Sequence, residues 1–422
     1  MKTLCTPLEH VNRRLLLKGA LTTAAGGALM NWGGLFNSDA MAKEVKKQGK
    51  HCILIWLQGG CSQFETFDMK VGRPTGGPFR EISTNVAGAR VCELMPGIAQ
   101  KMDKLTVIRS MRTSQVDHGG GTYSMHTGWT RTPAVRFPEI GAIVAKYCGD
   151  VESNLPSFIK IGSGGGGAGL LGPQYDSFAL DRDGGLPRNS ASRFPAEQEL
   201  RRHRLRNFVE NQFAQDRSAE PIRVHQEAYD RARRLNNVRD RFELDAEWAK
   251  SRNNYGNSKI GRRMMTAARL VEAGVAFVEV RHTDYDFHGD NFEGHKALVP
   301  PMEHAWAALL EDLEARGLLD DTLVVWMGEI GRTPKINNRC GRDHYVRSWS
   351  TALAGGGVKG GLVYGESDKD GVDVKENKVT EGDLFATIYT ALGVDPKTEN
   401  FAGVRPIPLA QFGHRVVKDI LI

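Results

Sequence analysis

Residues 52–60 read CILIWLQGG, and this stretch decides the fold. Its first six residues are apolar without interruption, and a glycine pair follows one glutamine later. A fully apolar strand that ends in glycine is typical of a parallel sheet whose two faces are both covered. Cys52 and Trp56 within it are therefore expected to be core residues.

Similar apolar runs recur at residues 105–108, 158–161, 275–280 and 323–327, and each predicts a further strand. Residues 260–271 and 298–313 instead carry apolar side chains at helical spacing, and Gly274 and Gly317 are their stop signals. Strands that alternate with helices in this way predict an α/β fold, with a doubly wound, mostly parallel sheet and helices on both faces.

Residues 195–251 interrupt this alternation, because they are dense in charged and amide side chains. Apolar residues recur among them at Leu205, Phe208, Val209 and Phe213. The pattern predicts a helical insertion made of amphipathic helices with solvated outer faces. The glycine-rich residues 162–169 are expected to form a surface loop, since no Lys-Ser/Thr pair or helix start follows them.

The chain begins with the features of a bacterial export signal. Arg13 and Arg14 precede a weakly apolar stretch at residues 20–36, and Ala40-Met41-Ala42 is a small-x-small cleavage pattern. We therefore predict a twin-arginine signal peptide at residues 1–42, a mature domain at 43–422, and a periplasmic or extracellular location. The alternative is that the segment is retained as a membrane anchor; no stable membrane span is expected after cleavage.

Charge and cysteine content narrow the classes of function. The 422 residues carry a net charge of +6, of which residues 1–42 carry +2, so the mature part is only mildly basic and no nucleic-acid partner is expected. Five cysteines remain after cleavage, without a Cys-x-x-Cys spacing. This odd count disfavours a disulfide framework and a zinc-thiolate site. Because the twin-arginine route carries folded proteins, often with a metal or cofactor loaded, a metal site in the mature part is worth seeking.

Polar side chains gather after several of the predicted strands, where an open α/β sheet binds its ligands. They comprise Gln58 and Asp68 after the first strand, Asp117, His118 and His126 after the second, residues 281–288 (RHTDYDFH) after the fourth, and Glu329, Arg332, Arg342, Asp343 and His344 after the fifth. Imidazoles with carboxylates and no thiolates suit Zn, Mn or Fe, or Ca and Mg where carboxylates dominate. His126 is expected to be a satisfied polar residue, because it lies inside a helix.

The motifs resemble the bacterial domain-of-unknown-function family 1501, placed in the alkaline phosphatase/sulfatase superfamily. The resemblance covers residues from about 50 to 415, in the expected order. It rests on residues 56–60 (WLQGG), 66–68 (TFD), 126–128 (HTG), 268–275 (ARLVEAGV), 286–288 (DFH), 322–325 (TLVV), 328–334 (GEIGRTP) and 341–344 (GRDH). The resemblance implies an alkaline phosphatase-like fold, and Thr380 with Asp383 opens the stretch that resembles the superfamily's final helix.

The superfamily's usual residues are replaced at three places. Its strand ending in Asp-His corresponds here to Glu329-Ile330, and its first strand ends in Gln58 in place of a metal-binding Asp. His118 stands where the sulfatase spacing puts a Ser, Thr or Cys nucleophile, and no formylglycine signature is present. The superfamily's Asp-x-x-x-His pair corresponds either to Asp284 and His288 or to Asp286 and His288.

From these residues we predict an exported, metal-dependent hydrolase of phosphate or sulfate esters, acting on an anionic small molecule or polymer. The predicted ligands of a divalent metal (Zn, Mn, Ca or Mg) are Asp286, His288, Glu329, Asp343 and His344. His118 is a candidate ligand, proton donor or nucleophile, Arg332 a candidate catalytic residue, and Gln58 and Arg342 candidate substrate-binding residues. The alternative is a non-catalytic extracellular protein that binds a ligand or partner on a degenerate hydrolase scaffold.

Overall fold

A computed structural model describes residues 49–150, 153–162, 164–187, 193–215 and 242–422, together with a few residues between 222 and 229. The predicted signal peptide, residues 1–42, lies outside the described residues. None of the described helices combines the length and apolar character that a membrane crossing requires.

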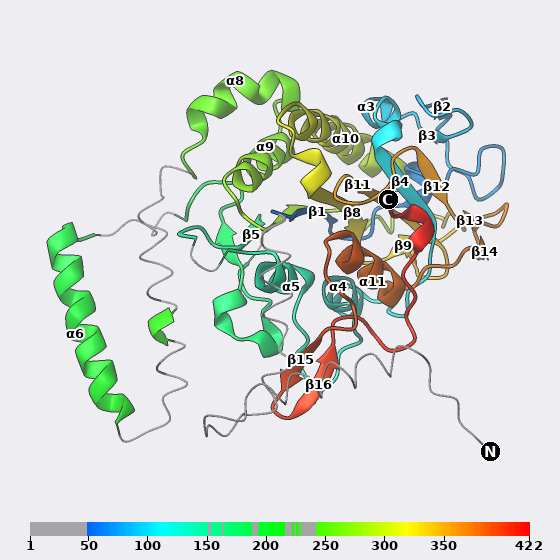
Figure 1. Ribbon diagram of the computed structural model, residues 1–422. Coiled ribbons are helices and arrows are strands. Elements are labelled where there is room, and N and C mark those ends of the chain that lie inside the picture. Colours follow the sequence, from blue (N-terminus) through cyan, green and yellow to red (C-terminus); the bar gives the residue numbers. More distant parts are fainter. Residues whose placement is uncertain are drawn as a thin grey trace, which may run out of the picture. The chain divides into compact units, whose positions relative to one another are not determined.

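An eight-stranded sheet forms the centre of the fold (Figure 1). In spatial order its strands are β12 (Leu362–Tyr364), β4 (Leu105–Met111), β11 (Trp349–Ala354), β8 (Thr322–Gly328), β1 (His51–Leu57), β7 (Phe277–His282), β5 (Phe158–Ile161) and β6 (Phe178–Leu180). Only β11 pairs antiparallel with its neighbours in this sheet. The predicted fold class is therefore confirmed.

Helices cover both faces of the sheet (Figure 1). One face carries α8 (Asp245–Tyr255), α9 (Lys259–Glu272), α10 (Asn291–Ala315) and the short α3 (Pro96–Ala99), and the other carries α4 (His118–Thr127), α5 (Ile140–Tyr147) and α11 (Glu381–Ala391). Successive side chains of β1 point to opposite faces. Accordingly Ile53 and Ile55 join the core under α9 and α10, whereas Leu54 and Trp56 join the core under α5 and α11.

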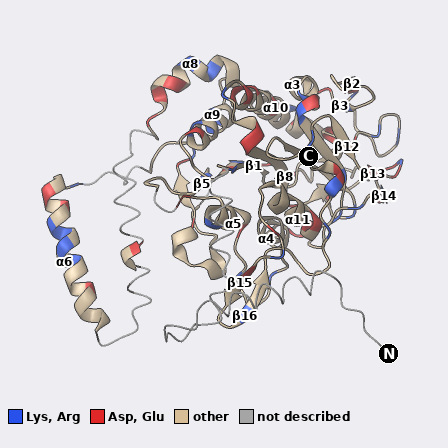
Figure 2. Ribbon diagram, viewed as in Figure 1, with Lys and Arg blue, Asp and Glu red and all other residues tan. Residues whose placement is uncertain are grey.

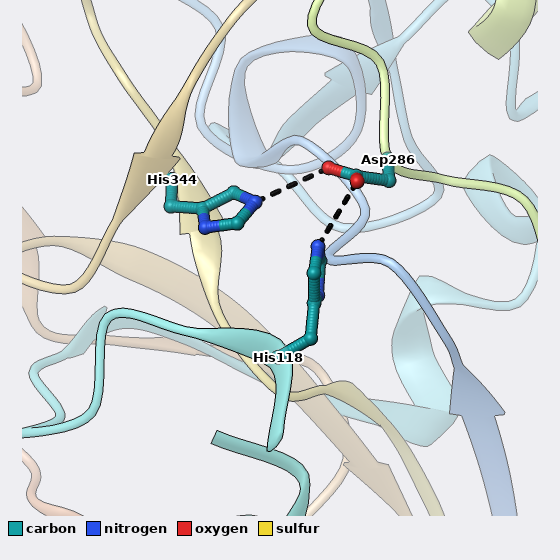
Figure 3. A group of neighbouring side chains, drawn as sticks. All are labelled: His118, Asp286 and His344. Carbon is teal, nitrogen blue, oxygen red and sulfur yellow. Dashed lines mark hydrogen bonds and ion pairs between the residues drawn. The ribbon is translucent and has the colours of Figure 1, made fainter. Parts of the chain in front are cut away.

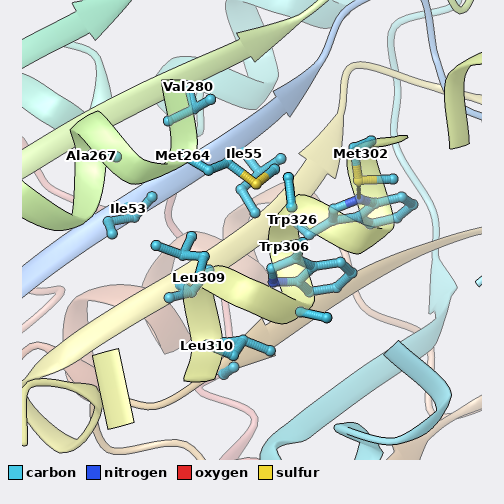
Figure 4. Close-up of a cluster of buried hydrophobic side chains, with 14 of the residues drawn as sticks. Ile53, Ile55, Met264, Ala267, Val280, Met302, Trp306, Leu309, Leu310 and Trp326 are labelled. Carbon is cyan, nitrogen blue, oxygen red and sulfur yellow. Dashed lines mark hydrogen bonds between the residues drawn. The ribbon is translucent and has the colours of Figure 1, made fainter. Parts of the chain in front are cut away.

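The core under α9 and α10 is built around stacked aromatic rings (Figure 4). The rings of Trp306 and Trp326 lie parallel with centroids 5.8 Å apart, and Trp326 Nε1 contacts Met302 Sδ at 3.4 Å. Trp56 and Trp326 are thus core residues, as predicted, and so is Cys52. Cys52, Cys61, Cys92, Cys148 and Cys340, the cysteines of the described residues, are all free thiols.

Four two-stranded ribbons lie outside the main sheet: β2 (Glu81–Ser83) with β3 (Arg90–Cys92), β9 (Gly331–Arg332) with β10 (His344–Tyr345), β13 (Glu366–Ser367) with β14 (Val374–Glu376), and β15 (Glu399–Ala402) with β16 (Arg405–Pro408). The predicted cap of the last helix is present, because Thr380 and Asp383 form a reciprocal capping box at the start of α11.

The helix α6 (Ala196–Ala214) falls within the predicted insertion, and Figure 2 shows the charged residues that it carries. An acidic first turn is followed by a run of arginines. Its apolar residues Leu205, Phe208, Val209 and Phe213 are half or more exposed, so the described residues do not bury the apolar face that the sequence predicts. Much of residues 195–251 lies outside the described ranges, and the insertion stays a prediction.

A buried carboxylate on α10 makes stability depend on pH. Glu303 is 3 % exposed, and its Oε2 accepts a 2.9 Å hydrogen bond from the Ile98 amide at the start of α3. Burial raises the pKa of Glu303 to about 7, although the amides of Ile98 and Gly97 act in the opposite direction. Between about pH 4.5 and 7 the unfolded chain has lost this proton and the folded chain retains it. The free energy of unfolding therefore decreases as the pH rises through this window.

We expect Glu303→Gln to remove this dependence. From pH 5 to pH 8 the parent should lose roughly 3 kcal/mol of unfolding free energy more than the variant, because one pKa unit is worth about 1.4 kcal/mol. Urea unfolding at the two pH values measures the difference. Glu311→Gln on the same helix is the control, since that side chain is 70 % exposed. An equal decline in parent and Glu303→Gln would show that Glu303 ionises normally.

Candidate functional site

The candidate site lies where three parallel strands end at the same level. Leu57 of β1 pairs with both His282 of β7 and Gly328 of β8, so the segments after all three strands meet at one edge of the sheet. Gly59 allows them to meet closely, because it has a φ of 104° and a Cβ there would lie 2.6 Å from the Asp286 amide nitrogen. Only glycine tolerates both conditions.

Asp286 is surrounded by three imidazoles at this edge (Figure 3 shows two of them). Its Oδ2 lies 3.1 Å from His118 Nε2, and its Oδ1 lies 3.1 Å from His288 Nε2 and 3.2 Å from His344 Nε2. The Nε2 atoms of His288 and His344 are also only 3.1 Å apart. Four side chains from three separate segments thus meet at Asp286, and the ligand atoms of His118, Asp286 and His344 all lie within 4.8 Å of one another.

Each imidazole is also held in its orientation by a hydrogen bond at its other ring nitrogen, Nδ1. The acceptors of the three Nδ1–H groups are Glu329 Oε1 for His118 (2.8 Å), Asp343 Oδ1 for His288 (2.6 Å) and the Val116 carbonyl for His344 (2.9 Å). When a neutral ring carries its proton on Nδ1, where these oxygens accept it, its Nε2 lone pair is directed toward Asp286 and is free to bind a cation. A carboxylate or carbonyl behind the histidine is the usual arrangement around a protein-bound metal.

Arg332 and the imidazoles set the electrostatics at Asp286. His118 Nε2 is inaccessible to solvent, and its neighbour at 3.1 Å is Asp286 Oδ2. The hydrogen bond to Glu329 raises the pKa of His118. Partial burial opposes ionisation of Asp286, but the hydrogen bond and charge of Arg332 hold its pKa well below the usual range. Asp286 is therefore anionic, with the Arg332 guanidinium paired to its Oδ1.

Local structure explains how His118 and His344 reach the site. Asp117 caps α4 by accepting from the Gly120 amide at 2.8 Å, so His118 is the first residue of that helix. The β9–β10 ribbon pairs His344 with Arg332. Gly341 permits the ribbon's loop to pack on the 286–288 segment, since a Cβ there would lie 2.2 Å from His288 backbone atoms.

Arg332 is a positioning residue in this arrangement. It is fully buried, its Nη2 lies 2.6 Å from Asp286 Oδ1, and its other donors reach the carbonyls of Gly59, Gly60 and Arg342. The guanidinium thus fixes Asp286 and the glycine turn together. This placement does not fit the predicted catalytic role, because the side chain is fully buried and each of its three nitrogens already has a partner inside the protein.

The structure also argues against a substrate-binding role for Arg342. Its buried guanidinium pairs with Glu65 Oε1 at 2.9 Å, and both side chains are 0 % exposed. The remaining donors reach the carbonyls of Thr75, Thr333 and Pro334. Every donor is engaged inside the protein, so Arg342 holds the loop that carries Asp343 and His344. Glu65 was not predicted as a partner of Arg342, and its signal in the sequence is a charge within residues 63–68 (QFETFD).

The predicted ligand set is corrected at two positions and extended at one. Asp286, His288 and His344 converge as predicted. Glu329 and Asp343 do not join them, because their carboxylates receive the Nδ1–H groups of His118 and His288. His118, for which three roles were open, contributes its Nε2 to the cluster. Gln58 is exposed and lines the space above the site, consistent with its predicted contact to substrate.

Two open clefts adjoin the cluster. One of about 1150 Å³ lies along α4 and the glycine-rich loop, and one of about 770 Å³ lies beside β7 and the start of α9. Gln58, His118 and Arg281 line both clefts. The glycine-rich segment is a loop, as predicted, and its residues 165–169 line the larger cleft.

A second group of potential ligands, His126, Glu139 and Glu279, lies along the larger cleft. The amine of Lys160 lies 2.6 Å from Glu139 and 3.9 Å from Glu279, so it already supplies the positive charge there. His126 is buried in α4, with Nδ1 bonded to the Thr122 carbonyl and Nε2 3.3 Å from Glu279. It is thus the satisfied helical residue that the sequence predicts.

Solved structures with a similar chain course are distant. The lipoteichoic acid synthase LtaP from Listeria monocytogenes is 9 % identical, with 88 % of this chain and 80 % of that chain covered and a TM-score of 0.39. The PsFucS1 sulfatase from Pseudoalteromonas sp. is 13 % identical, with 85 % and 72 % covered and a TM-score of 0.38. A protein in the alkaline phosphatase superfamily from Vibrio parahaemolyticus is 11 % identical, with 85 % and 76 % covered and a TM-score of 0.34. Similarities this weak carry no argument about function.

No curated protein matches the sequence. One family model does match, over residues 49–421, and it therefore spans the sheet, both helical layers and every residue of the site. The chain belongs to the family described as "Protein of unknown function (DUF1501)".

Proposed function

We propose that the protein is an exported, metal-dependent hydrolase of phosphate or sulfate esters. The observation that carries the proposal is the convergence of the Nε2 atoms of His118, His288 and His344 on the Asp286 carboxylate, each ring being held through Nδ1. The sequence resemblance to the alkaline phosphatase/sulfatase superfamily supports the class of reaction.

The cluster fits a divalent ion by distance and by donor chemistry. Ligands about 2.1 Å from one ion, at tetrahedral or octahedral angles, lie about 3.0–3.4 Å from each other. The three distances from Asp286 to the imidazoles and the distance between His288 and His344, at 3.1–3.2 Å, fall within that range. Three imidazoles with one carboxylate suit Zn, Mn or Fe better than Ca or Mg, which prefer oxygen ligands. The proposal therefore favours Zn, Mn or Fe over Ca and Mg, which the sequence alone did not exclude.

A bound divalent ion would supply the positive charge that stabilises the developing charge on the ester oxygens. The chain's own residues orient the reaction around it. Arg332 fixes the Asp286 carboxylate, and the Gly59 amide donates to Glu329 Oε1 at 2.7 Å, which in turn holds His118. Gln58 lines both clefts above the cluster and can donate its amide to the substrate.

Water is the nucleophile that this site favours. His118 occupies the first position of α4, where the resembling enzymes carry a hydroxyl or thiol nucleophile, but its Nε2 is inaccessible and faces Asp286. An incoming ester cannot reach that nitrogen, so a phospho-histidine is not part of the proposal. The hydroxyl of Ser114 donates to Glu381 at 2.7 Å and is not among the groups that line the two clefts.

The test is hydrolysis of aryl phosphates and aryl sulfates by the purified mature protein, loaded in turn with Zn²⁺, Mn²⁺ or Fe²⁺. We expect turnover with at least one metal and its loss in His288→Ala. His304→Ala is the matched control, because His304 lies on α10 and is not among the residues of the site. Absence of turnover with every metal would refute the proposed activity.

The competing function is a metal-containing binding protein without catalysis. The observation in its favour is the histidine that stands in place of a side-chain nucleophile at the start of α4. Under this alternative the protein still binds metal stoichiometrically, but no phosphate or sulfate ester is hydrolysed by any metal form. Metal content together with the turnover assay therefore separates the two functions.

Removal of a carboxylate that orients one of the imidazoles should lower the metal affinity of the site without abolishing metal binding. Asp343 contacts His288 Nδ1 at 2.6 Å and lies outside the cluster itself. We expect Asp343→Ala to lower zinc affinity by about 10- to 100-fold, the usual cost of losing a partner behind a ligand. Competition with a zinc-sensitive dye measures the affinity, and Asp370→Ala in the 368–373 turn is the control. An unchanged affinity would mean that Asp343 does not orient His288.

The location is part of the proposal. Export in the folded state would allow a site of four ligands, drawn from three segments, to be loaded before the protein leaves the cytoplasm. Replacement of Arg13 and Arg14 by lysine should retain the unprocessed protein in the cytoplasm. Detection of such a variant outside the cytoplasm at the parental level would contradict twin-arginine export.

A further inference from the structure

The two clefts beside the metal-ligand cluster meet at Gln58, His118 and Arg281, which line both of them, and together the clefts are called the groove. His118 and Asp286 of the cluster are among its lining residues. The larger cleft, at about 1150 Å³, alone exceeds the roughly 300–1,000 Å³ of a pocket for a drug-sized ligand. A single small ester would leave most of this space to water.

Exposed cations line both arms of the groove. Arg131 and Arg136 lie on the larger cleft, and Arg182 and Lys259 lie on the smaller one. The carboxylates of the larger arm are already engaged, because Glu139 pairs with Lys160 and Asp176 accepts the Ala168 amide at 2.7 Å. In the smaller arm, Lys259 lies 3.9 Å from Asp183, and the acidic lining residues are Asp284, Asp286 and Glu329 beside the cations Arg182, Lys259, Arg263 and Arg281. Each arm therefore offers excess positive charge to a ligand.

Arg281 stands where the arms meet. Its side chain is 22 % exposed, and its Nη2 lies 3.4 Å from the buried Glu279 carboxylate, which also contacts His126. Its Nε is buried without a hydrogen-bond partner among the described residues. Glu279 thus anchors one side of the guanidinium, and donors remain for an oxyanion beside the cluster. Arg263 also lines the smaller cleft, but it donates to the carbonyls of Arg182 and Arg281. It therefore holds these two segments together.

We propose that the groove binds an extended anionic polysaccharide, bearing sulfate or phosphate esters, with Arg281 holding the ester at the cluster and the two arms holding anionic groups on either side. The inference rests on the proposed function and names its substrate class. The remaining lining favours a hydroxyl-rich chain, because Gln58, Thr122, Thr132 and Thr283 offer hydrogen bonds along the same surface. Since both clefts adjoin Arg281, a chain that occupied both would place an internal position at the cluster, so the ester need not be terminal.

The test is equilibrium binding of fluorescein-labelled dextran sulfate to the full mature protein, measured by anisotropy at low salt. Unsulfated dextran, glucose 6-sulfate and single-stranded DNA are the comparison ligands. We expect the Arg131→Ser/Arg136→Ser and Arg182→Ser/Lys259→Ser variants each to weaken dextran sulfate binding about tenfold, since binding to a polyanion depends on the number of cations in contact. Lys369→Ser/Lys397→Ser removes the same charge from exposed sites outside both clefts, and should change the affinity less than twofold.

Arg281→Gln should weaken the binding of glucose 6-sulfate as well as of the polymer, whereas the arm variants should affect the polymer alone. The proposal is overturned if the arm variants bind dextran sulfate like the Lys369→Ser/Lys397→Ser control. It is also overturned if DNA binds as tightly at equal charge, or if dextran sulfate does not bind at all. Unfolding midpoints confirm that each variant is folded. Because the titration needs no turnover, binding without hydrolysis would count against the proposed activity and not against the groove.

Discussion

Replacement of Asp286 by Asn is expected to abolish stoichiometric metal binding and, with it, ester hydrolysis. Asp286 supplies the negative charge toward which the three Nε2 atoms point, at 3.1, 3.1 and 3.2 Å. An amide removes that charge and presents an N–H₂ group either to the lone pairs or to Arg332. Since loss of a supporting residue alone costs about 10- to 100-fold in metal affinity, loss of this ligand should cost more than about 100-fold.

Isothermal titration with Zn²⁺ measures this effect. Asp284→Asn is the matched control, because it makes the same substitution two residues earlier on an exposed side chain. Asp284 has a φ of 79°, a conformation that Asn also tolerates, so the control should retain the fold and the metal. Equal zinc affinity in Asp286→Asn and the parent would show that this carboxylate is not a ligand.

Replacement of Arg342 by Met is expected to destabilise the protein by about 3–5 kcal/mol, the usual cost of leaving one partner of a buried ion pair uncompensated. Both Arg342 and Glu65 are fully buried, and the guanidinium also satisfies three carbonyls. Urea unfolding at pH 7 measures the loss. The same substitution should leave substrate affinity per folded molecule unchanged, because no donor of Arg342 faces the groove.

Lys375→Met provides the comparison for Arg342→Met. Lys375 pairs with Glu366 at 3.0 Å, but the two side chains are 54 % and 56 % exposed, so its removal should cost at most about 1 kcal/mol. The double variant Glu65→Leu/Arg342→Met should recover part of the loss, since no charge is then left unpaired. A fully stable Arg342→Met protein with weakened substrate binding would restore the substrate-binding role that the sequence suggested.

The sequence predicted the sheet well where apolar runs were long and uninterrupted. Residues 52–57, 105–108, 158–161 and 323–327 all lie in strands of the sheet, and the run at 275–280 begins two residues before β7. The strand β11 was missed, because its WSTALA sequence contains small and hydroxyl side chains and shows no apolar run. Its antiparallel pairing with β4 and β8, which buries those side chains, follows from tertiary contacts.

The site was predictable as a set of residues but not as a set of roles. Strand-end reasoning brought Asp286, His288 and His344 together, because parallel strands deliver their following loops to one edge. Sequence alone cannot tell a carboxylate that lies among the Nε2 atoms, as Asp286 does, from one that contacts an imidazole Nδ1, as Glu329 and Asp343 do in the structure. The Val116 carbonyl that orients His344 is a backbone group and leaves no signature in the sequence.

The buried arginines illustrate the same limit. Arg332 and Arg342 lie in polar, loop-forming sequence, where an exposed clamp for an anion is the natural reading. Both side chains are 0 % exposed in the structure. The burial of Arg332 results from the contact of the β9–β10 ribbon with the glycine turn after β1, which sequence alone does not predict. Nothing in the sequence distinguishes Arg281 from the other polar residues at 281–288. Its position beside the cluster follows from the strand register, which pairs it with Trp56 near the end of β7.

The most direct measurement of the central claim is anomalous diffraction from crystals of the mature protein grown with Zn²⁺, recorded on both sides of the zinc absorption edge. The account predicts one strong anomalous peak about 2.0–2.2 Å from the Nε2 atoms of His118, His288 and His344 and from an Asp286 oxygen. The absence of a peak there, with the three rings still closed on Asp286, or a peak bound instead by Glu329 and Asp343, would contradict it.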